Sequence, residues 1–155
     1  MQTFKLQEVS EIVSGTLVGN GELEFSKIVT DSRNIINPSS CLFVAVVGEQ
    51  HDGHNYIDDI YRSGVRTFHV SKDIDTAKYS GISYVKVANT LEAMQKIATY
   101  KRLRFNIPVI GITGSNGKTI VKEWLHYLLS PYFNITRSPK SYNSQIGVPL
   151  SVWLL

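Results

Sequence analysis

The sequence predicts an α/β protein, with a small mixed-sheet domain over residues 1–106 followed by the start of a second α/β domain over residues 107–155. Three observations predict this class. Short β-branched runs alternate with segments of helical periodicity, as in sheets that helices cover. A glycine-rich loop stands between one such run and a helix. Finally, 43% of the 155 residues are hydrophobic and 19% are charged, which is typical of a folded globular chain.

The elements of the first domain follow one another in a simple order. Apolar residues recur at helical spacing from Leu6 to Val13, and Gly15 ends that helix. The continuous apolar run at 42–47 has the pattern of a strand buried on both faces. The other expected elements are a strand at 28–30, a turn at 37–40, a polar loop at 48–55, a helix at 56–62, strands at 67–70 and 83–87, and a helix at 91–103.

The second domain is expected to start after the Asn-Ile-Pro interruption at 106–108. A domain of this kind needs several parallel strands, whereas the chain has room for two and its last residues, 148–155, form an apolar stretch. We therefore expect the polypeptide to be a fragment of a longer protein. The expected elements are a strand at 109–113, a tight loop at 114–117, a helix at 118–129, a second strand at 133–136, a loop at 138–141 and a further element at 145–155.

Charge argues against a nucleic-acid-binding protein. The net charge is only +3, and the sixteen basic residues are spread along the chain, whereas nucleic-acid-binding proteins usually concentrate theirs. The densest basic stretch, from Lys96 to Arg104, lies in a predicted helix, and we interpret it as a solvated face that includes Lys101. Trp124 and Trp153 are interpreted as core residues in preference to stacking platforms.

The single cysteine, Cys41, excludes an intrachain disulfide and fits a reducing compartment. It begins an apolar run, so we expect a buried side chain and no catalytic thiol. The N-terminus lacks the basic start and apolar core of a signal peptide, and no apolar run approaches the ~20 residues that span a bilayer. We therefore expect a cytoplasmic protein, which we take to be a monomer.

The main functional signal is the glycine-rich loop, which reads Thr113, Gly114, Ser115, Asn116, Gly117, Lys118, Thr119. A strand, such a loop and Lys-Thr opening a helix form a phosphate-binding arrangement, in which backbone N–H groups and the helix N-terminus face the phosphates. Lys118 would reach the β- and γ-phosphates of ATP, and the Thr119 hydroxyl would ligate Mg²⁺. The general pattern has a glycine where Ile112 stands, and a plain glycine-rich turn is the alternative interpretation.

This form of the loop resembles the Mur ligase superfamily, whose loop reads Thr-Gly-Thr/Ser-Asn-Gly-Lys-Thr. Three further stretches agree with that family, and the resemblance covers essentially the whole chain. They are the Asp-Ser-Arg at 31–33, the Leu-Phe-Val-Ala run at 42–45 with the Asp-Gly-His at 52–54, and the Tyr-Asn-Ser-Gln-Ile-Gly-Val-Pro at 142–149. Single motifs of this kind are weak, but their order and spacing together are specific.

The resemblance implies an ATP-dependent amide ligase of peptidoglycan synthesis, which works through an acyl phosphate with Mg²⁺ and uses Lys118 as a catalytic residue. It also implies that the first domain holds the UDP end of a UDP-MurNAc-peptide. The pair Lys122-Glu123 indicates the family member that joins D-alanyl-D-alanine to UDP-MurNAc-tripeptide. A ligase that adds the third amino acid and a non-catalytic nucleotide-binding module are the alternatives. The implied substrate-binding residues are Ser32, Arg33, Asp52, Gly53, His54 and Asn143.

Some of these positions have other interpretations. The segment from His51 to His54 has the residue types of a metal site, although the sequence offers no third ligand cluster beside it, and a polar surface loop is also open. The Asp-Ser-Arg at 31–33 also suits a strand-end turn. Two positions depart from the family pattern: Ile120 stands where a second Thr or Ser is frequent, and Ser144 stands where a second Asn is common.

Overall fold

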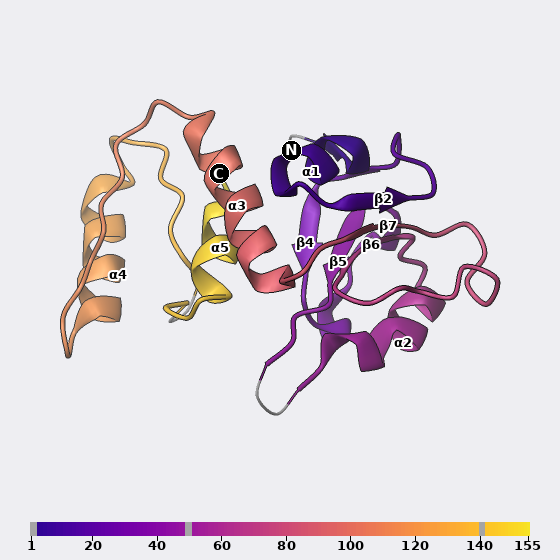
Figure 1. Ribbon diagram of the computed structural model, residues 1–155. Helices are drawn as coiled ribbons and strands as arrows, with labels where there is room; N and C mark the ends of the chain where they lie inside the picture. Colours follow the sequence, from indigo (N-terminus) through magenta and orange to yellow (C-terminus); the bar gives the residue numbers. More distant parts are fainter. Residues whose placement is uncertain (1–2, 49–50, 140–141) are drawn as a thin grey trace. The chain divides into compact units, whose positions relative to one another are not determined.

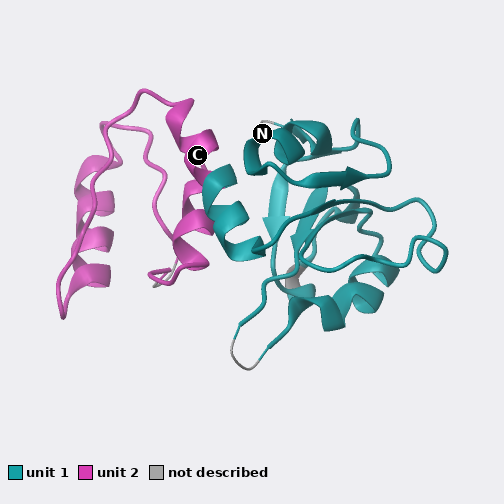
Figure 2. Ribbon diagram, in the orientation of Figure 1, with its two compact units in different colours: residues 1–97 teal, residues 98–155 magenta. Residues whose placement is uncertain are grey.

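The computed structural model describes residues 3–48, 51–139 and 142–155 (Figure 1). The chain divides into two compact units, residues 1–97 (unit 1) and residues 98–155 (unit 2) (Figure 2). The division falls inside one helix, α3 (Thr90–Leu103). The domain boundary expected from the sequence, between residues 106 and 107, stays a prediction. Among the described residues, no helix is both long enough and apolar enough to cross a membrane.

A five-stranded mixed sheet forms the centre of unit 1 (Figure 1). Its order is β2 (Thr16–Val18), β7 (Ser83–Lys86), β6 (Thr67–Val70), β5 (Cys41–Val44) and β4 (Lys27–Val29). The strands from β4 to β7 run parallel to their neighbours, and the edge strand β2 is antiparallel to β7. A separate two-stranded sheet pairs β1 (Phe4–Lys5) with β3 (Glu24–Phe25). The mixed α/β class expected from the sequence is confirmed.

Helices and short 3-10 turns connect these strands. The helix expected at the N-terminus is α1 (Leu6–Val13), which contacts β7 and ends at Ser14 in the left-handed conformation. The helix expected after the polar loop is α2 (Ile57–Arg62). The 3-10 turns are η1 (Ser32–Asn34), η2 (Pro38–Ser40) and η3 (Gly53–Tyr56). Two of these turns, η1 and η3, contain residues that the sequence predicts to bind substrate.

The central strands β5 and β6 carry the core of unit 1, because every residue of both strands is buried. The rings of Phe43 and Phe68 meet edge to face with their centroids 6.1 Å apart. Ile57 and Ile60 of α2 belong to the same apolar cluster. Successive residues of a strand face opposite sides of the sheet, so burial of the whole strand requires cover on both faces. The prediction of a strand buried on both faces is therefore confirmed.

β5 is nevertheless shorter than the strand expected at 42–47. The chain leaves the sheet after Val44, where the carbonyl of Val46 accepts a hydrogen bond from the Gly53 N–H at 2.9 Å and Val47 becomes exposed. Cys41 is fully buried in the strand, as expected. Burial raises the pKa of the Cys41 thiol, which is the opposite of what an activated nucleophile needs.

Unit 2 contains the end of α3 together with α4 (Lys118–Leu129) and α5 (Gly147–Val152). None of its described residues forms a strand, so the strands expected at 109–113 and 133–136 are wrong for this structure. The side chains of Val109 and Ile110 are 62% and 64% exposed. A strand needs a neighbour that accepts and donates its backbone hydrogen bonds. No described part of unit 2 supplies that neighbour.

Two side chains of unit 2 contradict the expectations from sequence. Lys101, expected in a solvated face, is buried, and its Nζ donates to the carbonyl of Trp153 and lies 4.5 Å from the centroid of the Trp153 ring. This contact joins α3 to the end of α5, and burial lowers the pKa of Lys101. Trp153 is buried as expected, but Trp124 is 68% exposed on α4. Helical periodicity places an apolar face on α4, and the described residues of unit 2 leave that face uncovered.

Candidate functional site

The glycine-rich loop of unit 2 leads directly into α4, which begins at the predicted residue, Lys118. Gly117 is the N-terminal cap of the helix, and Gly114 and Gly117 have φ angles of 144° and 78°. Residues with a side chain rarely adopt such angles, so the two glycines allow the loop to turn where it does. The first N–H groups of a helix have no intrahelical acceptor and lie at the positive end of the helix dipole. The backbone therefore suits a phosphate group.

The ammonium group of Lys118 is turned back over this loop. Its Nζ donates to the carbonyl of Gly114 at 2.5 Å and lies 3.4 Å from the carbonyl of Ser115. A positive charge is thus held at the loop that would surround a phosphate. A phosphate bound there would replace neutral carbonyl acceptors by a charged one, so that both partners of the hydrogen bond carry charge.

A cavity of about 690 Å³ lies beside the loop within unit 2. Its lining includes Lys118 and Thr119 of the loop and also Asn143, which the family resemblance assigns to the substrate. Cavities of roughly 300–1,000 Å³ are the usual size for small-molecule sites. The structure therefore brings three of the predicted site residues to one cavity, although Asn143 lies in a separate sequence motif.

The residues directly after the loop tie α4 to the segment that precedes the Asn143 motif. The Nζ of Lys122 donates to the carbonyl of Ser138 at 2.8 Å and lies 3.1 Å from a carboxylate oxygen of Glu123. Glu123 is also ion-paired with Arg137. The sequence analysis used Lys122-Glu123 only to distinguish between family members. Its structural role as an anchor depends on a contact between residues far apart in the chain, so sequence reasoning missed it.

The described residues offer only part of a magnesium site. Thr119 stands in the first turn of α4, directly after Lys118, and its role as a ligand of a metal bound to phosphates stays a prediction from the loop pattern. Among the described residues, no group of three or more His, Cys, Asp or Glu side chains is arranged to hold a metal ion. Magnesium bound to nucleotide takes much of its coordination from phosphates and water, so a single hydroxyl fits a partial role.

The other predicted site residues gather in unit 1, at the edge of the sheet where the parallel strands end. The segment at 31–33 follows β4, and the Asp-Gly-His at 52–54 lies in the connection that follows β5. Ser71 and Lys72 directly follow β6. Ligands of open α/β sheets bind outside the carboxyl ends of the strands. The topology therefore places these segments, which the resemblance assigns to one substrate site, at the same edge of the sheet.

At the end of β4, Asp31 and Arg33 form a local clamp around η1. The carboxylate of Asp31 accepts the backbone N–H of Arg33 at 2.9 Å and the Nε of the guanidinium at 2.9 Å. The side-chain hydrogen bond from Arg33 is the main cause that lowers the pKa of Asp31. Tyr56 of η3 also contributes to raising the pKa of Arg33, after the larger effect of Asp31. The clamp is the strand-end turn considered as an alternative, and it does not exclude a role in binding.

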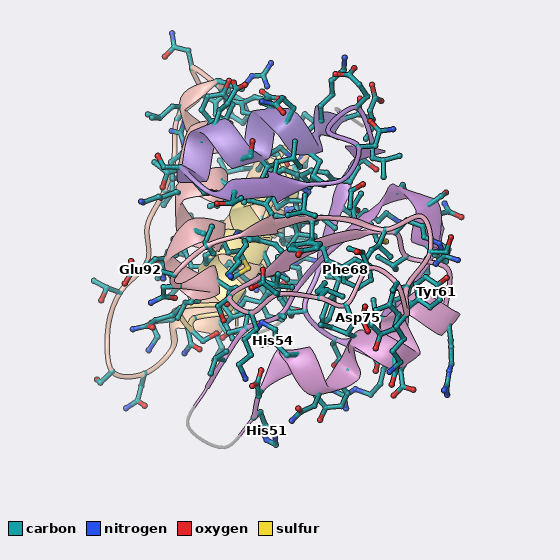
Figure 3. All side chains as sticks on the ribbon, turned by 45° about the vertical axis from the view of Figure 1, so that its right-hand side comes forward. His51, His54, Tyr61, Phe68, Asp75 and Glu92 are labelled. Atoms are coloured by element: carbon teal, nitrogen blue, oxygen red, sulfur yellow. The ribbon has the colours of Figure 1, made fainter. Side chains whose placement is uncertain are left out.

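After β5, Asp52 and His54 form a second and denser cluster, of which Figure 3 labels His54. Asp52 accepts the backbone N–H of His54 at 2.9 Å, and its carboxylate lies 2.5 Å from the Nδ1 of His54 and 2.5 Å from the Nζ of Lys72. The backbone N–H of Ser71 donates to the Nε2 of His54 at 3.0 Å. Hydrogen bonding from Lys72 is the largest cause that lowers the pKa of Asp52 well below its usual range.

Gly53 stands between these two residues for a steric reason. A Cβ atom at this position would lie 2.8 Å from the Cα of Ala45 and 2.8 Å from the backbone nitrogen of Val46. Both atoms belong to the backbone that follows β5, so they cannot move aside as the tip of a side chain could. Sequence reasoning missed Ser71 and Lys72; their position after the third parallel strand was the available signal.

Comparison with known proteins supports the family expected from the motifs. No protein-family model matches the sequence. The UDP-N-acetylmuramoyl-tripeptide--D-alanyl-D-alanine ligase of Synechocystis sp. is 36% identical over 128 residues, which are 83% of this chain and 28% of that protein. A crystal structure of MurF from Acinetobacter baumannii matches 99% of this chain and 33% of its own chain, with a TM-score of 0.88 and 29% identity. The chain belongs to the Mur ligase family.

This Mur ligase chain spans only 28% and 33% of the length of those two proteins. MurF from Thermotoga maritima in complex with ADP matches 82% of the chain and 28% of its own, with a TM-score of 0.68 and 30% identity. A UDP-N-acetylmuramoyl-L-alanyl-D-glutamate--2,6-diaminopimelate ligase of Phocaeicola vulgatus is 33% identical over 132 residues, 83% of this chain and 27% of that protein. Relatives with two different amine substrates therefore match the same part of a Mur ligase.

Proposed function

We propose that this chain is part of a MurF-type ligase, which uses ATP to join D-alanyl-D-alanine to UDP-MurNAc-tripeptide through an acyl phosphate. The observation that carries the proposal is the phosphate loop at the start of α4, on the same cavity as Asn143. The D-alanyl-D-alanine ligase of Synechocystis, with 36% identity, supports the choice of acceptor. The ADP complex of the Thermotoga relative supports the choice of nucleotide.

In this proposal each part of the loop has a defined task. The backbone N–H groups at 114–119 and the Lys118 ammonium hold the β- and γ-phosphates, and they offset the charge that develops on the transferred phosphoryl group. Thr119 would hold the magnesium ion that accompanies ATP. When bound, Mg²⁺-ATP supplies the phosphoryl group that activates the substrate carboxylate. Asn143, on the same cavity, would seat the diphosphate of the nucleotide-sugar.

Unit 1 has the task of holding the uridine end of the substrate in this proposal. The support is that Ser32, Arg33 and the loop containing Asp52 all lie at the carboxyl edge of the parallel strands. That edge is where α/β sheets bind ligands. The reduced and buried Cys41 is consistent with a cytoplasmic enzyme, which is where we place it.

A ligase that adds diaminopimelate is the second candidate, since the Phocaeicola relative of that name is 33% identical. The pair Lys122-Glu123 favours the MurF type by its resemblance to that family member. A non-catalytic nucleotide-binding module is the third candidate. The loop argues against it, because both Lys118 and Thr119, the residues needed for phosphates and metal, are present.

The test is an amine-specificity assay on the full-length ligase that contains this chain. ADP release is measured with UDP-MurNAc-tripeptide and D-alanyl-D-alanine, and separately with UDP-MurNAc-dipeptide and diaminopimelate. We expect turnover only with the first pair. Turnover with the second pair alone would identify the diaminopimelate-type ligase, and the absence of ATP-dependent ligation with either pair would contradict the proposed function.

A further inference from the structure

Both ring nitrogens of His54 are already engaged within unit 1. The Nε2 atom lies 3.0 Å from the backbone nitrogen of Ser71, which can only donate. Nε2 must therefore accept, and the ring proton must be on Nδ1, where it is donated to Asp52 at 2.5 Å. The side chain is only 8% exposed. A hydrogen bond from the ring to a ligand would thus require one of these two contacts to break.

Both carboxylate oxygens of Asp52 also have hydrogen-bond partners already. One carboxylate oxygen accepts the backbone N–H of His54 at 2.9 Å and faces Nδ1 of the same residue, while the other accepts the Lys72 ammonium at 2.5 Å. These partners come from two places in the chain, η3 and the end of β6. The cluster therefore fastens the connection after β5 to the neighbouring strand.

His51 belongs to the same connection but is not part of this cluster. Val47 and Asp52 form an isolated β-bridge, and the Gly48 N–H donates to the His51 carbonyl at 2.8 Å. The side chain of His51 is exposed, and Figure 3 shows it pointing away from the sheet, whereas His54 lies against it. Asp52 and His54 thus hold their part of this connection, whereas the His51 side chain is exposed.

We propose that Asp52 and His54 are positioning residues, which pin the base of the loop after β5 to the end of β6 and so shape the nucleotide site without touching the nucleotide through the imidazole. The inference rests on the proposed function of unit 1 as the uridine site, and it changes the role that the family resemblance implies for these residues. Each of the four contacts that carry it joins polar groups at 3.0 Å or less.

The experiment uses the 155-residue chain with UDP as the probe. Amide hydrogen exchange of Ser71 and the imidazole ¹⁵N shifts of His54 are measured by NMR, with and without UDP. His54→Ala should speed exchange of the Ser71 amide about 10-fold or more, because its acceptor is lost. His54→Gln, whose side-chain oxygen can replace Nε2 as acceptor, should restore most of the protection. Lys72→Ala changes an exposed side chain, so it should reduce the protection of the Ser71 amide less than His54→Ala does.

His51→Ala is the matched control, since it removes an exposed histidine of the same loop and should leave Ser71 exchange unchanged. In the wild-type chain, UDP should shift amides near 31–33 and 45–54 while the His54 Nε2 resonance stays at its acceptor-type position. A UDP-dependent change of that resonance, or unchanged Ser71 exchange in His54→Ala, would overturn the proposal. If UDP shifts no resonance of unit 1, the uridine site is wrong, and the exchange comparison alone still decides whether His54 holds the loop.

Discussion

His69 makes the stability of unit 1 depend on pH in a calculable way. It lies in the middle of β6, is fully buried, and neither ring nitrogen has a hydrogen-bond partner among the described residues. Burial lowers its pKa from 6.5 to about 4. The folded chain therefore binds this proton less readily than the unfolded chain, so its neutral form contributes fully above pH 6.5 and the contribution is lost as the pH falls toward 4.

The magnitude follows from the difference between the two pKa values. A gap of roughly 2.5 corresponds to about 3 kcal/mol of unfolding free energy lost between pH 7 and pH 4. The carboxylates with lowered pKa values, such as Asp31 and Asp52, change charge at still lower pH, because their ordinary value is 3.8. Between pH 6.5 and pH 4.5, the change in the free energy of unfolding therefore reports mainly on the protonation of His69.

The assay compares the wild-type chain with His69→Leu, a substitution of similar volume. Urea unfolding is followed through NMR signals of β5 and β6 at several pH values from 7 to 4.5, so that unit 1 is observed by itself. We expect the free energy of unfolding of the wild type to fall with pH and that of His69→Leu to stay nearly level. The variant should also be more stable at pH 7, by about 1–3 kcal/mol, since it removes unsatisfied polar atoms. Equal pH dependence in the two proteins, or an NMR titration of His69 near 6.5, would refute the reasoning.

Three further predictions concern Lys118 of the phosphate loop, Gly53 of unit 1 and the 155-residue chain as a whole. In the full-length ligase, Lys118→Ala should lower kcat/KM at least ~100-fold, because a charge on the transferred phosphoryl group is left without its partner; a near wild-type steady-state rate would show that the loop has another task. Gly53→Ala should destabilise unit 1 by about 1–3 kcal/mol, because its Cβ would lie 2.8 Å from backbone atoms, and an unchanged thermal midpoint would contradict this. The 155-residue chain alone should release no phosphate with UDP-MurNAc-tripeptide, ATP and D-alanyl-D-alanine, and substrate-dependent release would sink our expectation that catalysis needs further domains.

Elements whose cause is local could be predicted from the sequence. α4 begins at Lys118 because a glycine with positive φ caps a stretch of helical periodicity, and both features lie within a few residues of each other. β5 was predicted because a continuous run of apolar residues can be recognised in the sequence without knowledge of its neighbours. β2, at Thr16–Val18, was not predicted. Three residues carry no periodicity, and this strand exists only because β7 supplies its hydrogen bonds.

The strand predicted at 109–113 is the opposite error, since it was expected and did not form. Its origin is the same: a strand depends on a neighbour that pairs with it. The segment has a β-branched strand pattern, yet it forms no strand here because no described neighbour pairs with it. Lys101 shows a related limit for side chains. Its basic neighbours in the sequence indicate a solvated face, but α5, far along the chain, covers it and offers the Trp153 carbonyl as an acceptor.

The sequence by itself determined the family and predicted the phosphate loop with a role for each of its residues, because these inferences depend on residue types at fixed spacing along one segment. Only the tertiary structure decided that Asn143 shares a cavity with Lys118. It also decided that His54 is held by Asp52 and Ser71, although sequence and resemblance marked it as a substrate contact. The physical reason is that the donors and acceptors a side chain still has available depend on partners from other strands. The order of strands in a sheet cannot be inferred from any single segment of the sequence.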